Sequence, residues 1–170
     1  LFRGNHDVWA FNYFERELNI KLYRHPEIME FNGKKFYLSH GDGLGPGDNG
    51  YKFLKKVFAC RVNQWLFRWL HPDLGAKMGL YFSKRSRLAN IAKEGKKDYT
   101  NNIQDEMLYR YTLEMAQKYP DIDYFIFGHR HLPISDKIGT AEMVILGDWI
   151  TNFTYAVFDG KDLKLVSFMD

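Results

Sequence analysis

The sequence predicts a layered α/β fold, and three observations support this prediction. Short apolar segments of strand length alternate with longer segments whose apolar residues recur at helical spacing. The last third of the chain is dominated by short segments with the pattern of consecutive strands. The 170 residues, of which 45% are hydrophobic and 26% charged, suffice for one globular domain with a sizeable core.

The first fifty residues are predicted to form one helix and several short strands around a hairpin. Residues 28–31 and 35–39 are the arms of the hairpin, because the intervening Asn32-Gly33 is a preferred two-residue turn. The other predicted elements are the end of a strand at Leu1-Phe2, a helix over residues 9–18, a brief strand at Leu22-Tyr23, and a loop rich in glycine and proline over residues 43–50.

From residue 51 to residue 119 the apolar pattern is helical, and this range is predicted to be a helical insertion between two strands of the domain. His71-Pro72 ends the first helix, and Pro120 lies beyond the last one. The predicted helices cover residues 51–69, 73–82, 84–93 and 101–119, the last being the longest clear one. The predicted strands outside the insertion cover residues 124–127, 134–137, 143–146, 155–158 and 163–168.

The insertion differs from the rest of the chain in charge. Residues 51–100 contain 12 Lys and Arg against 3 Asp and Glu, whereas the whole chain has a net charge of only +3. Aromatic residues are interleaved with these cations, which leaves three interpretations open: a packed helical layer with a basic rim, a groove for an acyl chain beside a patch that attracts anionic lipid, or a nucleic-acid surface. We rank nucleic acid last and expect no such partner, because the aromatic residues fall on the apolar stripe.

Cysteine content and hydropathy exclude two classes of protein. Cys60 is the only cysteine, which excludes an internal disulfide framework and agrees with a reducing compartment. No uncharged apolar run approaches the roughly 20 residues that span a bilayer, so we do not expect an integral membrane protein.

Three short blocks share one architecture, in which an apolar strand end is followed by glycine, histidine and a nearby Asn or Asp. They are Gly4-Asn5-His6-Asp7, Ser39-His40-Gly41-Asp42 and Gly128-His129-Arg130-His131. Gly128 is expected to supply the turn that lets both histidines of the last block face one site. Imidazole with amide or carboxylate oxygen is a ligand set that suits zinc, manganese, iron or nickel, so the repetition predicts a metal site.

These blocks, in this order, resemble the third, fourth and fifth signatures of the calcineurin-like metallophosphoesterases, and the likeness covers nearly the whole chain. The resemblance implies a two-sheet sandwich flanked by helices and two divalent metal ions that hydrolyse phosphate esters and anhydrides. It implies that Asn5, His40 and His129 ligate one ion and that His131 ligates the other. His6 would contact the substrate phosphate, and Asp7 would orient His6.

The first two signatures of that family, Asp-x-His and Gly-Asp, would precede Gly4 and are absent from this sequence. We therefore expect residues 1–170 to be the carboxyl-terminal part of a metallophosphoesterase domain. Asp148, which lies far downstream, fits neither of the two missing positions. The alternative to an enzyme is a non-catalytic fragment that forms homo-oligomers through exposed strand edges.

Within the family, the basic and aromatic insertion and the segment Asp48-Asn49-Gly50-Tyr51 are similar to the members that cleave the pyrophosphate of UDP-linked diacylglucosamine in lipid A biosynthesis. That similarity implies manganese, a nucleotide-linked glycolipid substrate, and a peripheral, cytoplasmic place on the inner face of the bacterial inner membrane. It implies that Asp48 contacts the glucosamine headgroup and that residues 83–97 add polar contacts. The alternative within the family is an enzyme for another phosphodiester or phosphomonoester.

Overall fold

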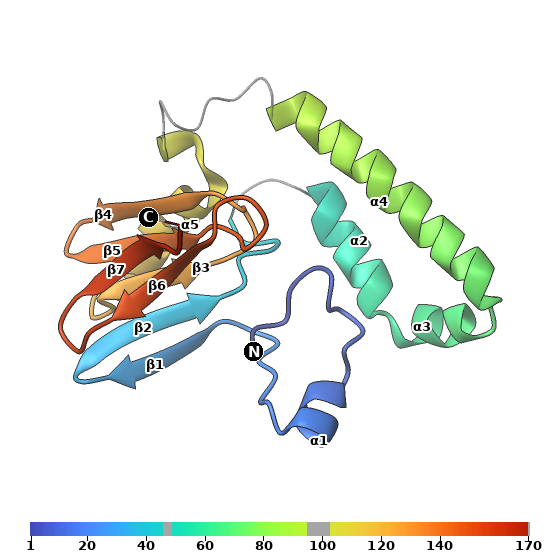
Figure 1. Cartoon of the computed structure of the whole chain (residues 1–170), viewed down its shortest axis with the longest axis horizontal. Helices are drawn as coiled ribbons and strands as arrows, with labels where there is room; N and C mark the ends of the chain where they lie inside the picture. Colours follow the sequence, from blue (N-terminus) through green and yellow to red (C-terminus); the bar gives the residue numbers. More distant parts are fainter. Residues whose placement is uncertain (46–48, 95–102, 170) are drawn as a thin grey trace. The chain divides into compact units, whose positions relative to one another are not determined.

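The computed structural model describes residues 1–45, 49–94 and 103–169, and the chain divides into two compact units (Figure 1). The first, which we call the sheet unit, comprises Leu1–Gly47 and Met107–Asp170. The second, the helical unit, comprises Asp48–Glu106. The predicted α/β class is confirmed, since the described residues form a five-stranded mixed sheet, a separate two-stranded sheet and helices.

The sheet unit contains a five-stranded sheet and a separate two-stranded sheet. The larger sheet has the order β1-β2-β3-β5-β4, in which β2, β3 and β5 are parallel and the two edge strands are antiparallel. The strands are β1 (Glu27–Phe31), β2 (Lys34–Ser39), β3 (Tyr124–Phe127), β4 (Pro133–Ile138), β5 (Ala141–Leu146), β6 (Thr154–Phe158) and β7 (Leu163–Ser167). Strands β6 and β7 pair with each other as an antiparallel ribbon.

The predicted hairpin is confirmed as β1 and β2. Asn32 and Gly33 both have positive φ, at 50° and 75°, as a two-residue turn of the I′ type requires. The turn fixes the register, in which Phe31 pairs with Lys34 and Glu27 with Leu38. Strand β2 then continues directly into His40.

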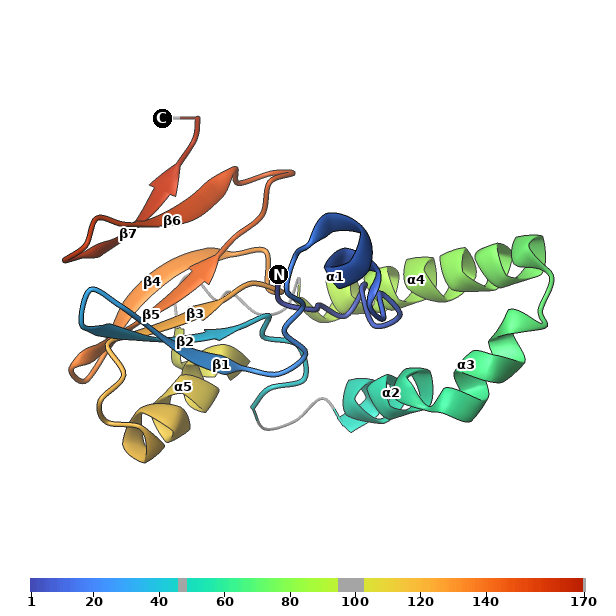
Figure 2. The ribbon, with the colours of Figure 1, turned by 90° about the horizontal axis from the view of Figure 1, so that it is seen from below.

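Alternate residues of the strands face two different layers. On one face of the larger sheet, buried Phe36, Tyr124 and Val144 pack with Leu163 of β7. On the other face lies helix α5 (Met107–Lys118), whose Tyr111 shares a hydroxyl hydrogen bond of 2.6 Å with Tyr37. Figure 2 shows the β6-β7 ribbon and α5 on opposite sides of the five-stranded sheet. The sheet is thereby covered on both faces, as a layered fold requires.

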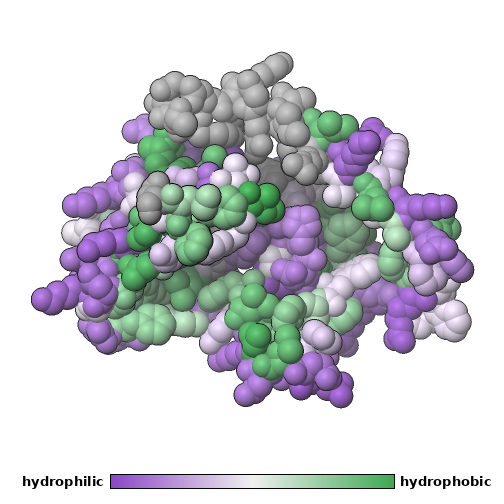
Figure 3. Space-filling view, viewed as in Figure 1, coloured by the Kyte–Doolittle hydropathy of each residue, from purple (hydrophilic) through white to green (hydrophobic). Residues whose placement is uncertain are grey.

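The helical unit contains α2 (Asn49–Ala59), α3 (Arg61–Arg68), α4 (Pro72–Glu94) and the 3₁₀ turn η1 (Ile103–Asp105). No residue of α2 or α3 is buried. Large apolar side chains along these helices are exposed instead, and Figure 3 shows hydrophobic residues at the surface of this unit. The exposed members include Phe53, Phe58, Trp65, Trp69, Tyr81 and Phe82.

Several predicted helix boundaries are wrong. The helix predicted over residues 51–69 is broken at Cys60, which is extended, and the amides of Asn63 and Gln64 donate to the carbonyls of Val57 and Phe58 at the end of α2. These side chains satisfy carbonyls that a helix end leaves without partners. The helices predicted over 73–82 and 84–93 are one continuous helix, α4, with Pro72 at its first position, where proline is tolerated.

Three further elements differ from the prediction. The first helix is only α1 (Tyr13–Leu18), and Leu22-Tyr23 forms no strand but one parallel bridge between Tyr23 and Phe2. Among the described residues the longest helix is α4, whereas the described part of the segment predicted as the longest contains η1 and α5. Helix α5 lies within the predicted insertion of residues 51–119 but belongs to the sheet unit. The role of the insertion stays a prediction.

Candidate metal centre

Three segments that are distant in sequence bring polar side chains to the edge of the larger sheet that is formed by the carboxyl ends of its parallel strands. The parallel strands β2 and β3 end at this edge and continue into His40 and His129. The amino-terminal segment is attached to Tyr23, because the amide of Arg3 donates to the Tyr23 carbonyl at 2.9 Å and the Tyr23 amide donates to the Leu1 carbonyl at 2.8 Å. The carboxyl ends of parallel strands are the usual place for sites in such folds.

Asn5, His40 and His129 meet there. The side-chain oxygen Oδ1 of Asn5 lies 3.2 Å from Nε2 of His40 and 3.3 Å from Nδ1 of His129. The two imidazole rings are inclined to each other by 63°, with centroids 5.4 Å apart. One amide oxygen and two ring nitrogens therefore converge on a common point.

These distances fit a shared divalent ion. Ligand atoms about 2.1 Å from one ion lie roughly 3.0–3.4 Å from each other at octahedral to tetrahedral angles. The two measured separations, 3.2 and 3.3 Å, fall in this range. The described residues contain no group of three His, Cys, Asp or Glu side chains that could hold a metal, so the Asn5 amide oxygen is essential to this donor set.

The surroundings of His129 favour its neutral form, which is the form that binds metals. Burial, followed by the neighbouring His40, lowers the pKa of His129 from its ordinary 6.5 to about 4. The imidazole is therefore uncharged near neutral pH, and its ring nitrogen does not need to lose a proton before it binds a cation.

Gly4 explains why the first block begins with glycine. A Cβ atom at this position would lie 2.7 Å from both Cε1 and Nε2 of the His40 ring. Any side chain at residue 4 would therefore displace the imidazole from Asn5. The glycine is required here for close approach of the backbone to the ring.

The turn after β3 is built differently from the prediction. Gly128 does not have positive φ; the left-handed residues are His129 and His131 themselves, at 67° and 54°. The Gly128 amide donates to the His40 carbonyl at 3.1 Å, which joins the two histidine loops. The expected role of Gly128 in supplying the turn is thus wrong, and the strained backbone lies at the two histidines.

His131 lies close to an acidic residue that follows β5, the strand beside β3 in the sheet. Its Nδ1 is 3.5 Å from Oδ2 of Asp148, which follows β5. The other carboxylate oxygen, Oδ1, accepts the backbone amides of Ile150, Thr151 and Asn152 at 2.9, 2.6 and 3.1 Å. Hydrogen bonds from these amides, that of Thr151 foremost, lower the pKa of Asp148 to about 2, so the carboxylate is charged.

A cavity of about 990 Å³ extends from these residues into the sheet unit. His40, His129, His131 and Asp148 form its polar part. Apolar side chains from both sheets form the rest, and they include Phe36, Leu38, Ile126, Leu146, Ala156 and Phe158. The histidines are thus accessible from a space with low polarity.

The remaining predicted site residues are His6, Asp7 and Asp48, and no described contact joins them to one another. His6 is exposed and follows Asn5 directly, while the amide of Asp7 donates to the Gly4 carbonyl at 3.2 Å. Over the described part of the chain no hydrogen bond or ion pair joins Asp7 to His6, and the orienting role of Asp7 stays a prediction. Asp48 lies outside the described residues, as do residues 95–97 of the predicted headgroup contacts.

The sequence reasoning missed Asp148 and Asn152 as residues of this edge. It tested Asp148 only against the two missing motifs. The available signal was the segment Leu146-Gly147-Asp148, in which an apolar strand end is followed by glycine and a polar residue, as in Phe127-Gly128-His129. Because β5 is parallel to β3 and adjacent to it, this segment ends beside Gly128-His129-Arg130-His131.

Comparison with characterised proteins gives relatives over nearly the whole chain. The chain is 35% identical over 179 residues to UDP-2,3-diacylglucosamine hydrolase of Porphyromonas gingivalis. This alignment covers 99% of the chain and 68% of the relative. It is 24% identical over 169 residues to the proteins of the same name in Yersinia pseudotuberculosis and Yersinia pestis, over 97% of this chain and 67% of those relatives. No protein-family model matches the chain.

Proposed function

The chain belongs to the UDP-2,3-diacylglucosamine hydrolase family, and we propose that it acts in the reaction for which these relatives are named. The substrate would be UDP-2,3-diacylglucosamine, and hydrolysis of its pyrophosphate bond would give the lipid monophosphate and UMP in lipid A biosynthesis. The observation that carries the proposal is the convergence of the Asn5 oxygen with the ring nitrogens of His40 and His129.

Asn5, His40 and His129 would hold one divalent ion, and His131 would contribute to a second. Imidazole and amide oxygen form a donor set that suits zinc, manganese, iron or nickel, and manganese is the metal that the resemblance to the family implies. Bound divalent ions would polarise the phosphoryl oxygens and activate water for attack on phosphorus.

The residues of the chain would act on the phosphate in distinct ways. His6 is exposed next to Asn5 and would donate a hydrogen bond to a phosphoryl oxygen as negative charge develops there. His129 is neutral near pH 7 and would remain a ligand throughout the reaction. The apolar walls of the cavity would lower the polarity around His40 and His129, which strengthens electrostatic contacts there.

The helical unit would bind the lipid part of the substrate. Its exposed aromatic side chains are accompanied by exposed cations, including Arg61, Arg68, Lys84 and Arg85. An apolar surface with a cationic border is typical of proteins that lie on anionic membranes, and the same combination would suit an acylated sugar phosphate. No helix among the described residues has the length and hydropathy to cross a bilayer. The resemblance to the family implies that this binding is peripheral, on the cytoplasmic face of the inner membrane.

Release of UMP from UDP-2,3-diacylglucosamine tests the function. We expect release that depends on Mn²⁺ and is abolished by EDTA, both for the wild-type protein and for variants that keep the metal ligands. Equal turnover of a chromogenic phosphodiester and the lipid substrate would instead indicate an enzyme for another phosphate ester. Activity that survives His40→Ala or His129→Ala would contradict the proposed site.

A further inference from the structure

Asp148 occupies a position beside the metal centre that the sequence did not predict. It follows β5, the neighbour of β3 in the sheet, so it emerges next to the loop that carries His131. The Asp148 side chain is only 10% exposed, whereas that of His131 is 62% exposed. A largely covered carboxylate thus faces an imidazole that is mostly exposed to solvent.

The carboxylate is fixed by its own loop. Oδ1 accepts the three backbone amides of residues 150–152, so the side chain has one oxygen committed to the loop. The second oxygen, Oδ2, faces Nδ1 of His131 at 3.5 Å and accepts a hydrogen bond of 3.1 Å from the side-chain amide of Asn152. Oδ1 therefore accepts from backbone amides, whereas Oδ2 faces two side chains.

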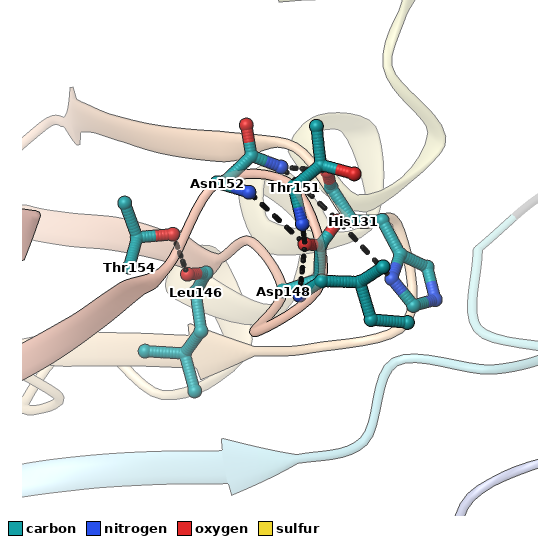
Figure 4. Close-up of polar contacts among 7 residues, drawn as sticks. His131, Leu146, Asp148, Thr151, Asn152 and Thr154 are labelled. Carbon is teal, nitrogen blue, oxygen red and sulfur yellow. Dashed lines mark hydrogen bonds and ion pairs between the residues drawn. The ribbon is translucent and has the colours of Figure 1, made fainter. Parts of the chain in front are cut away.

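Asn152 connects the carboxylate to the backbone of His131. Its Nδ2 donates to the His131 carbonyl at 2.9 Å as well as to Oδ2 of Asp148 (Figure 4). His131 has a φ of 54°, a conformation that residues other than glycine adopt rarely, and such a backbone persists only where its surroundings hold it. The Asn152 side chain supplies one hydrogen bond to this backbone.

The two ends of the loop that carries Asp148 are also joined to each other. Thr154 Oγ1 donates to the Leu146 carbonyl at 2.7 Å, and a Cβ atom at Gly147 would lie only 2.2 Å from that hydroxyl (Figure 4). Gly147 also has a φ of 79°. The loop from Gly147 to Thr154 is thus held at both ends, and it presents Asp148 in one orientation.

We propose that Asp148, supported by Asn152, is a positioning residue that holds a proton on Nδ1 of His131 and so presents Nε2 of His131 as the metal-binding nitrogen. A carboxylate that accepts from one ring nitrogen fixes both the tautomer and the direction of the other nitrogen's lone pair. The inference rests on the proposed function in one respect only, namely that the partner of Nε2 is a metal ion.

The test compares Asp148→Asn with wild-type protein. Asparagine keeps an oxygen that can accept the three loop amides, but it replaces Oδ2 with an NH₂ group that cannot accept a proton from His131. Long-range ¹H–¹⁵N spectra of the histidine rings report the tautomer directly. We expect His131 to carry its proton on Nδ1 in the wild-type protein and to shift toward the Nε2 form in Asp148→Asn.

The matched control is Asp159→Asn. Asp159 accepts the backbone amides of Lys161 and Asp162, both at 2.9 Å, in the turn between β6 and β7, so it resembles Asp148 in its loop but does not contact a histidine. The tautomer of His131 should be unchanged in this variant. Retained hydrogen-exchange protection of the amides of Ile150, Thr151 and Asn152 in Asp148→Asn would show that the loop itself is intact.

Paramagnetic broadening of the His131 ring by Mn²⁺ gives a second readout. The Mn²⁺ concentration that broadens this resonance should rise about 10- to 100-fold in Asp148→Asn, as it does when an outer partner of a metal ligand is lost. A wild-type His131 protonated on Nε2, or an identical tautomer in both proteins, would overturn the inference. The expected tautomers without any Mn²⁺ binding would uphold it and contradict the proposed function instead.

Discussion

The sheet unit and the helical unit differ in where they place their apolar side chains. Every large hydrophobic residue that is buried in the described part of the chain belongs to the sheet unit, from Leu22 to Leu163. The helical unit exposes Phe53, Trp65 and Trp69 instead. The difference agrees with the proposed function, in which the packed sheet unit would hold the metal ligands and the exposed helical surface would bind the apolar part of the substrate.

The largest expected effect is on the core of the sheet unit. Phe125 is fully buried in β3, two residues before the strand ends at Phe127. Phe125→Ala should lower the free energy of unfolding by about 3–5 kcal/mol. The matched change in the helical unit, Phe53→Ala, should cost about 0.5 kcal/mol or less, because this side chain is exposed. Urea denaturation measures both, and equal losses would contradict the comparison.

The next largest effect is on the metal ligands. Loss of an outer partner of a metal ligand typically costs 10–100-fold in affinity, so removing the ligand in His40→Ala or His129→Ala should cost at least about 100-fold in Mn²⁺ affinity. Isothermal titration calorimetry would measure this loss. His25→Ala is the control, since His25 is exposed and distant in sequence from the three blocks. An unchanged affinity in His129→Ala would remove that residue from the site.

Gly4→Ala tests how tightly the scaffold surrounds His40. The added methyl group would lie 2.7 Å from the ring and displace it, so we expect a loss of Mn²⁺ affinity on the order of tenfold. Gly79→Ala is the control, because a Cβ atom there meets nothing within 4 Å and alanine favours the helix. Metal affinity equal to wild type in Gly4→Ala would show that the ring has room to move.

The helical surface should respond to changes that leave the scaffold intact. Trp65 and Trp69 contact each other edge to face with ring centroids 5.9 Å apart, and both are exposed. Replacing both by alanine should weaken binding to vesicles of anionic phospholipid on the order of tenfold, because apolar area is removed from the contact. Vesicle co-sedimentation measures this loss, and Mn²⁺ affinity should be unaffected. Unchanged sedimentation would contradict the role of this surface.

The smallest expected effect concerns Asp123, which joins β2 to the start of β3. Partial burial raises its pKa, but hydrogen bonds from Lys34 at 2.8 Å and from the Lys35 amide at 2.9 Å outweigh it, so the pKa lies below the ordinary 3.8. A lowered pKa stabilises the folded state fully above pH 3.8, and this contribution is lost as the pH falls through the folded-state value.

Asp123→Asn should therefore lower the free energy of unfolding by less than about 1 kcal/mol at pH 6, since the ion pair is partly exposed. The difference from wild type should shrink as the pH falls below 3.8. Urea denaturation at several pH values measures this trend, with Asp136→Asn as the control in the same sheet. A difference that grows toward low pH would contradict the assignment.

Parts of the structure with strong local signals could be predicted from the sequence. Asn32-Gly33 determines the hairpin because both residues accept positive φ, and the histidine blocks follow apolar strand ends. Interruptions of helices could not be predicted in this way. The break at Cys60 depends on side chains that cap the preceding carbonyls, and the apolar pattern continues across it.

The contacts of the site that depend on strand order could also not be predicted from the sequence. Asp148 approaches His131 only because β5 lies next to β3, a pairing that no local pattern reveals. The left-handed backbone of His129 and His131 was also not predicted, and the Asn152 side chain that donates to the His131 carbonyl comes from a loop distant in sequence. The residue types therefore indicated a metal site, whereas the order of the strands in the sheet determined that Asp148 and His131 meet.

The central claim is that Asn5, His40 and His129 hold one divalent ion. Anomalous diffraction from crystals of this protein grown with Mn²⁺ would test it most directly. The account predicts a manganese peak about 2.1 Å from Asn5 Oδ1, His40 Nε2 and His129 Nδ1. A protein that shows no peak at these three atoms, or a peak held by other residues, would contradict it.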